Sequence, residues 1–191
     1  MSIDQTKNSS ESALSADQIL RGLRSLSEEL ARQGIIGEIC LFGGAVMVLA
    51  FAARLTTKDV DGIFQPTTVI REIARRIAEE QQLPANWLND GVKGFLSARH
   101  ETTSANLPQF KNLRLTVPVP EYLLAMKCMA ARIGGTQGEV SDVPDILFLI
   151  RNLGLKSAAE VLDLVSQYYP QDRIPVKTQY LIEGLFEEGK V

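Results

Sequence analysis

Apolar residues recur along the chain with two different periods, and these periods predict helices and strands in alternation. Ile19, Leu23 and Leu26 lie three or four residues apart, which is the spacing of one face of a helix. Ser15 is the expected N-cap of this helix. Gly34 is expected to end it, because glycine commonly follows the last helical turn.

The remaining elements follow from the same patterns. Strands are predicted at 35–42, 58–64 and 111–119, further helices at 45–53 and 66–81, and a loop or short helix at 83–93. Beyond residue 120 only helices are predicted, at 121–133, 142–153, 156–168 and 175–187. This order predicts an α+β fold with a small mixed β-sheet and a helical C-terminal bundle.

The same boundaries suggest how the chain is organised. Residues 15–120 are expected to form an α/β core, and residues 121–191 a helical region packed on it. The polar, acidic residues 1–14 are predicted to be a disordered tail. At 191 residues, one domain with a helical annex is enough to account for the chain.

Composition narrows the classes of function. The longest apolar run, Ala45 to Ala53, is far shorter than the roughly 20 residues of a membrane span. The N-terminal residues lack the order of a signal peptide, so a cytoplasmic protein without membrane contact is expected. The net charge of −3 argues against a general nucleic-acid coat protein. With one histidine and two separated cysteines, a conventional zinc site is excluded.

Asp59 and Asp61 are therefore the main candidates for chemistry. They lie two residues apart on a predicted strand, so both side chains should project from the same face. Neighbouring carboxylates repel each other unless a positive charge lies between them, and oxygen ligands suit Mg²⁺. Gly43 and Gly44 precede them, where a strand enters a helix whose free N–H groups favour a phosphate. The alternative is that the aspartates only form a turn at the end of a strand.

The motif LFGG…TKDVDGIF resembles the hG[GS]…DhD signature of the nucleotidyltransferase superfamily, which includes polymerase beta. Residues 35–153 are most similar to the AbiEii/AbiGii-type toxin nucleotidyltransferases and their uncharacterised relatives. The segments PEYLLAMKCMAAR, from Pro120 to Arg132, and SDVPDILFLI, from Ser141 to Ile150, carry this closer likeness. The resemblance implies that the β-sheet core is a nucleotidyltransferase core.

The resemblance also implies a role for each matching residue. Gly43 and Gly44 would hold the triphosphate, and Asp59 and Asp61 would bind Mg²⁺, with a two-metal site expected. Gly44 stands where many members have serine, which removes one hydroxyl hydrogen bond and keeps the turn.

Four later residues are implicated in the same way. Lys127 matches the lysine that contacts the nucleotide phosphates, and Arg132 is a further candidate for the triphosphate. Asp142, with Asp145, matches a later acidic motif that supplies a third carboxylate or orients Lys127. Simpler explanations stay open: Lys127 extends to solvent from an apolar helix, and Asp142 and Asp145 favour a helix start.

The resulting hypothesis is an enzyme that transfers NMP from an NTP to an acceptor hydroxyl. The resemblance favours a toxin of a toxin–antitoxin or phage-defence system that acts on RNA, such as a tRNA, with a cognate antitoxin protein as partner; a protein acceptor is also open. The alternative is a catalytically inactive member that serves as a nucleotide-binding or protein-interaction module.

Overall fold

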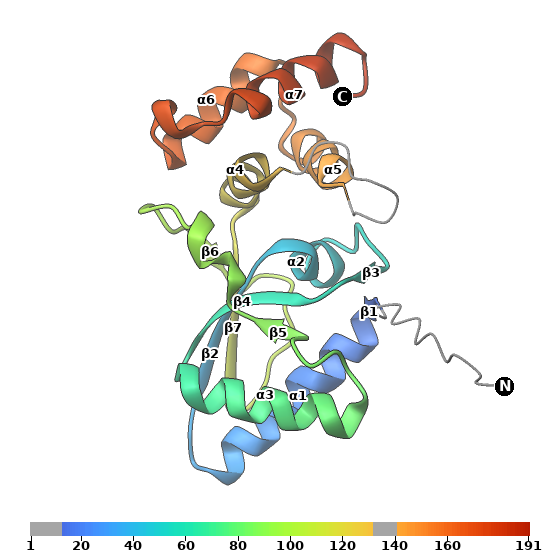
Figure 1. Ribbon diagram of the computed structural model, residues 1–191, viewed down its shortest axis with the longest axis vertical. Coiled ribbons are helices and arrows are strands. Elements are labelled where there is room, and N and C mark those ends of the chain that lie inside the picture. The colour runs from blue at the N-terminus through green and yellow to red at the C-terminus, as the bar shows by residue number, and fades with distance from the viewer. Residues whose placement is uncertain (1–12, 132–140) are drawn as a thin grey trace, which may run out of the picture.

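The computed structural model describes residues 13–131 and 141–191. Figure 1 shows a β-sheet with helices on both sides in one part of an elongated molecule, and a stack of C-terminal helices in the other. The predicted α+β class, with a mixed sheet followed by helices, is confirmed. None of the helices in the described ranges is long and apolar enough to cross a membrane.

The central sheet has the strand order β5-β4-β2-β7-β6. Its strands are β2 (Gly37–Leu41), β4 (Val60–Gln65), β5 (Leu88–Asn89), β6 (Thr102–Thr103) and β7 (Leu113–Pro118). Strand β2 is antiparallel to β4 and parallel to β7. The backbone N–H of Phe42 donates to the carbonyl of Asp61 at 2.8 Å. This register places the end of β2, where the chain turns into Gly43, beside Asp61.

Three helices cover the sheet. Helices α1 (Ala16–Arg32) and α3 (Thr67–Gln81) pack together on one side, and α2 (Gly43–Leu49) lies on the other (Figure 1). The predicted N-cap of α1 is confirmed: Ser15 Oγ accepts from the Gln18 backbone N–H at 3.3 Å, and the Gln18 side chain accepts from the Ser15 N–H at 2.9 Å. This reciprocal capping box satisfies two N–H groups at the start of the helix.

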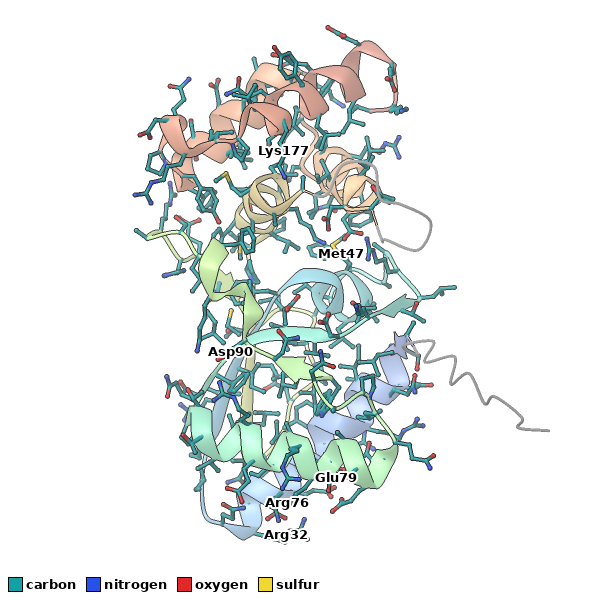
Figure 2. All side chains as sticks on the ribbon, in the orientation of Figure 1. Arg32, Met47, Arg76, Glu79, Asp90 and Lys177 are labelled. Carbon is teal, nitrogen blue, oxygen red and sulfur yellow. The ribbon has the colours of Figure 1, made fainter. Side chains whose placement is uncertain are left out.

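The C-terminal helices are α4 (Pro120–Ala130), α5 (Val143–Leu153), α6 (Ala158–Tyr168) and α7 (Val176–Glu187), with a short 3₁₀ turn, η2 (Gln171–Arg173). Helix α4 follows β7 directly and packs against α5 and α6. Helix α7 is attached to the end of α4: Lys177 Nζ, labelled in Figure 2, donates to the Ala131 carbonyl at 3.0 Å, and Thr178 Oγ1 donates to the Cys128 carbonyl at 2.8 Å. Helix α4 is therefore the connection between sheet and bundle.

Several boundaries differ from the sequence-based predictions. The pair β1 (Leu14–Ser15) and β3 (Thr56–Thr57), together with β5 and β6, was not predicted, because two-residue strands are too short for an alternating pattern. Pro66 is the N-cap of α3 and not its first residue. The segment 83–93 contains β5 and enters the 3₁₀ helix η1 (Gly91–Phe95). Residues 1–12 lie outside the described ranges, whereas Leu14 is buried, so the packed part of the chain begins before Ser15.

Candidate active site

One cavity of about 680 Å³ opens where the sheet meets helix α4, a volume in the range of small-molecule sites. Its lining residues come from five parts of the chain: Gly43, Gly44, Arg54, Thr57, Lys58, Asp59, Asp61, Asn86, Gly91, Val92, Phe95, Leu123, Met126, Lys127, Ala130 and Asp142. Six of these were singled out from the sequence: Gly43, Gly44, Asp59, Asp61, Lys127 and Asp142. The fold therefore brings together candidate residues that are almost one hundred positions apart.

The turn at Gly43 requires glycine for two reasons. Its φ of +60° lies in the left-handed region, which is unfavourable for residues with a Cβ atom. A Cβ atom at this position would lie 2.8 Å from Asp61 Oδ2. The absence of a side chain thus lets the backbone approach the Asp61 carboxylate closely.

At position 44 a different neighbour leaves no room for a side chain. A Cβ atom on Gly44 would collide with the side-chain hydroxyl of Thr57 on β3. Thr57 is buried, at 7% exposure, and lines the cavity. Its hydroxyl therefore occupies the space that a side chain at position 44 would need, so a serine there would require Thr57 to move.

Asp59 and Asp61 both line the cavity and are half-buried. Asn89 Nδ2 donates to Asp59 Oδ2 at 3.1 Å, and Asn89 pairs with Asp61 in the register of β5 and β4. The position of β5 is in turn held by Trp87, whose buried indole donates to the Ala74 carbonyl on α3 at 3.0 Å. Packing between α3 and β5 thus helps to fix the orientation of Asp59.

The donor chemistry of this pair fits magnesium. Mg²⁺ is commonly bound through one or two carboxylates together with substrate phosphates and water. Within residues 13–131 and 141–191, no group of three or more His, Cys, Asp or Glu side chains is arranged to hold a metal. Asp59 and Asp61 would therefore supply only part of the coordination of a Mg²⁺ ion, and phosphate oxygens and water would supply the rest.

Lys127 is buried in helix α4, with only 9% of its side chain exposed. Its Nζ lies 3.1 Å from Asp142 Oδ1 and 2.7 Å from Asp145 Oδ2. The explanation that Lys127 extends along an apolar helix into solvent is therefore wrong, because its charge is held inside the protein by two carboxylates and borders the cavity.

Asp145 joins this cluster to the core through a residue that sequence analysis missed. Its other oxygen, Oδ1, accepts from Arg54 Nε at 2.5 Å, and Arg54 Nη2 donates to the Ser141 carbonyl at 3.3 Å. We call Arg54, Lys127, Asp142 and Asp145 the buried ion cluster. It connects the loop after α2 with α4 and α5, so Asp145 lies behind the cavity wall as a partner of two cations.

The helix-cap explanation for Asp142 is not supported by its contacts. Asp142 occupies the N-cap position of α5, but its side chain makes no capping hydrogen bond. Ser141 Oγ instead accepts from the Val143 N–H at 3.2 Å. The Asp142 carboxylate contacts Lys127, as expected of a residue that orients this lysine.

Arg132, the remaining candidate, lies outside the described residues. Cys128, next to Lys127, has no exposed surface, and its burial raises the pKa of the thiol to about 12. A thiolate nucleophile is therefore unavailable at this point of α4. The polar side chains of the cavity lining are therefore its acidic and basic groups together with the Thr57 hydroxyl and the Asn86 amide.

Sequence analysis also missed Arg54, Thr57 and Phe95 as cavity residues. Arg54 and Thr57 lie within five residues of Asp59, so closeness to the acidic motif was a usable signal for both. Phe95 had no such signal, because it ends a 3₁₀ helix in the long connection between β5 and β6.

Comparison with known proteins identifies one matching protein family. The model of the family described as "Nucleotidyl transferase of unknown function (DUF2204)" matches residues 19–188. No curated protein and no solved structure matches the chain. The family match includes both the sheet and the C-terminal helices that form the cavity.

Proposed function

Because the chain belongs to this nucleotidyl transferase family of unknown function, we propose that it is a Mg²⁺-dependent nucleotidyltransferase that transfers NMP from an NTP to an acceptor hydroxyl. The observation that carries the proposal is the meeting of Gly43, Gly44, Asp59, Asp61 and Lys127 in one cavity. A glycine turn at a helix start, two carboxylates and a cation are suited to a magnesium-bound triphosphate.

In this proposal the two glycines bind the triphosphate and the two aspartates bind its magnesium ion, and the two groups of residues are neighbours because Gly43 adjoins the Asp61 carboxylate. The backbone at Gly43 and Gly44, at the start of α2, receives triphosphate oxygens, because the first N–H groups of a helix have no partner within it. Asp59 and Asp61 hold Mg²⁺. When bound, the metal would neutralise charge on the transferred phosphate and orient it for attack.

Two members of the buried ion cluster, Lys127 and Arg54, place positive charge at the lining of the cavity. Lys127 contacts the nucleotide phosphates, and Asp142 and Asp145 keep its ammonium group in place. Arg54 lines the cavity, and a Cβ atom on Gly44 would lie 3.8 Å from Arg54 Nη1. Arg54 thus adds a second cation beside the glycine turn, where a phosphate would bind.

The reaction forms one bond and breaks one. The acceptor oxygen bonds to the α-phosphorus as the bond from this phosphorus to the bridging oxygen breaks, and pyrophosphate leaves. The acceptor proton passes to a carboxylate of the pair Asp59 and Asp61. The chain contributes positioning and charge, which are the main sources of catalysis in phosphoryl transfer.

For the acceptor we favour RNA, with tRNA as the first choice. The support is the resemblance of residues 120–132 and 141–150 to the AbiEii-type toxins, which also suggests a cognate antitoxin. This support is an analogy between families, and protein hydroxyl groups are the second acceptor class to test.

The test follows labelled phosphate. The protein is incubated with Mg²⁺ and each NTP, labelled at the α- or the γ-phosphate, together with total cellular RNA or total cellular protein. We expect label from the α-phosphate, and none from the γ-phosphate, in one acceptor pool. The variant Asp61→Asn should abolish this transfer. Binding of NTP without transfer to either pool would contradict the proposal and favour the inactive nucleotide-binding module.

A further inference from the structure

The cavity has two chemically different walls. The wall around the glycine turn carries carboxylates and cations, as described above. The lining also has an apolar part, which we call the apolar wall, and it consists of Val92, Phe95, Leu123, Met126 and Ala130. These five side chains have no hydrogen-bonding N or O atom, so this wall has little to offer a phosphate or a magnesium ion.

Phe95 is the most unusual member of the apolar wall. It is 44% exposed, whereas Leu123 is 1% and Met126 5% exposed. A large aromatic side chain left open in a cavity is informative, because such rings are usually buried in a core or an interface. Phe95 therefore combines an exposed aromatic side chain with a place in the lining of the cavity that also contains Asp59 and Asp61.

The backbone at Phe95 is anchored on the C-terminal helices. The Tyr169 hydroxyl donates to the Phe95 carbonyl at 2.5 Å, and the Ser97 N–H donates to the Tyr122 hydroxyl at 3.0 Å. Ser97 Oγ donates to the Tyr168 carbonyl. Burial raises the pKa of Tyr169, so its hydroxyl keeps the proton that it donates. The ring is thus presented by a segment held at two nearby points.

We propose that the apolar wall is the nucleobase subsite of the NTP, and that the base stacks on the Phe95 ring while the triphosphate lies toward Asp59 and Asp61. This inference rests on the proposed function and specifies how the same cavity binds its substrate. The occupant is inferred from continuity: one ligand must satisfy a charged wall and a flat apolar wall in one cavity of about 680 Å³. A nucleoside triphosphate carries both chemistries in one molecule.

The strength of such stacking sets the expected effect. Removing an aromatic ring beneath a base costs about 1–3 kcal/mol, which corresponds to a roughly 5- to 150-fold weaker affinity. Because the apolar wall does not contact the phosphates in this arrangement, the affinity for inorganic triphosphate should not change when the ring is removed.

The experiment compares two probes on five proteins by calorimetric titration in Mg²⁺. The probes are ATP and inorganic triphosphate. The proteins are the wild type, Phe95→Ala, Phe95→Leu, Phe95→Trp and the control Tyr180→Ala, which removes an aromatic ring that is 71% exposed on α7. We expect Phe95→Ala and Phe95→Leu to weaken the affinity for ATP by roughly 5- to 150-fold. Phe95→Trp should retain the affinity for ATP. The affinity for inorganic triphosphate should be the same in all five proteins.

Three results would overturn the inference in distinguishable ways. Unchanged ATP affinity in Phe95→Ala and Phe95→Leu would show that the base binds elsewhere, while the proposed function would stand. An equal loss for ATP and triphosphate would assign Phe95 to the general shape of the cavity. If wild type bound neither probe, the proposed function would fail, and the nucleobase subsite with it. Thermal unfolding of each variant checks that it is folded.

Discussion

Two pairs of aspartates belong to the same region of the molecule and differ in their surroundings. Asp142 and Asp145, at the start of α5, are 5% and 2% exposed and contact Lys127; Asp145 also contacts Arg54. Asp59 and Asp61, at the start of β4, are half-buried and line the cavity. Asp142 also lines the cavity, but it and Asp145 are buried against cations of the same chain, whereas Asp59 and Asp61 are half-buried.

This difference predicts that the two pairs have different roles, one in stabilising the fold and the other in binding a ligand. Buried charges are tolerated when paired, and removal of one partner leaves the other uncompensated at high cost. The aspartates on α5 should therefore contribute to stability and to the placement of Lys127. The aspartates on β4 are half-buried, so their substitution should cost less stability and should mainly affect ligand binding. Four substitutions test this comparison, in order of decreasing expected effect.

Asp61→Asn should have the largest effect, and on activity alone. Loss of a metal-binding carboxylate should lower the rate of α-phosphate transfer by about 10³-fold or more, since a bound metal contributes several kcal/mol to the transition state. The midpoint of thermal unfolding without ligand should change little, because asparagine keeps the shape of the half-buried carboxylate and removes one of two nearby negative charges. Initial rates and melting curves on the same preparations give both values. A clear fall in the midpoint would instead favour a structural turn at the end of the strand.

Asp145→Ala should have the largest effect on stability. The substitution leaves Arg54 and Lys127 without their shared carboxylate, so the free energy of unfolding should fall by about 3–5 kcal/mol. Urea denaturation followed by circular dichroism measures this change. Asp59→Ala is the matched control from the half-buried pair and should cost less stability, because water can replace the hydrogen bond from Asn89 at a half-buried carboxylate. Equal losses in the two variants would remove the distinction between the pairs.

Gly43→Ala should have an intermediate effect. A left-handed residue with a Cβ atom costs about 1–2 kcal/mol, and the new atom would also press against the Asp61 carboxylate. Gly34→Ala is the control: Gly34 has a similar φ of +67° but no atom within 4 Å of the added Cβ. The difference between the two losses of stability, measured in urea, isolates the contact with Asp61. If the free energy of unfolding fell by the same amount in both variants, the contact with Asp61 would not affect stability.

Arg75→Ala should have the smallest effect. Arg75 and Glu79 form an ion pair at 2.6 Å with side chains 62% and 67% exposed. Figure 2 labels Glu79 on α3, far from the C-terminal helices. Exposed helix pairs of this kind contribute about 0.3–0.5 kcal/mol, so the urea midpoint should hardly move. A loss approaching that of Asp145→Ala would mean that burial is not what distinguishes the buried ion cluster.

The parts of the site that were predictable from sequence are local or carry a recognised motif. The glycine turn and the Asp59–Asp61 pair lie on one strand–helix–strand unit, where spacing alone determines which residues are near each other. Lys127 and Asp142 were found only through the family resemblance. Their mutual contact depends on how α4 packs against α5, which no periodicity encodes.

The parts that were not predictable depend on long-range packing. Arg54 and Asp145 are 91 residues apart in the chain, and nothing in either local sequence indicates the partner. Phe95 lies in a connection without regular spacing, and its position depends on long-range hydrogen bonds from Tyr169 to its carbonyl and from nearby Ser97 to Tyr122 and Tyr168. The same reason explains the four missed two-residue strands, whose pairing is set by neighbours and not by their own sequence.

The most direct test of the central claim, a magnesium-dependent NTP site at Asp59 and Asp61, is thermal unfolding with ligands. Wild type and Asp61→Asn are each melted with Mg²⁺ and ATP, GTP, CTP or UTP, and again without Mg²⁺. A ligand that binds the folded state must raise the midpoint. The account predicts a rise with at least one NTP that requires Mg²⁺ and is absent in Asp61→Asn. No rise with any NTP in a folded wild-type protein would contradict it.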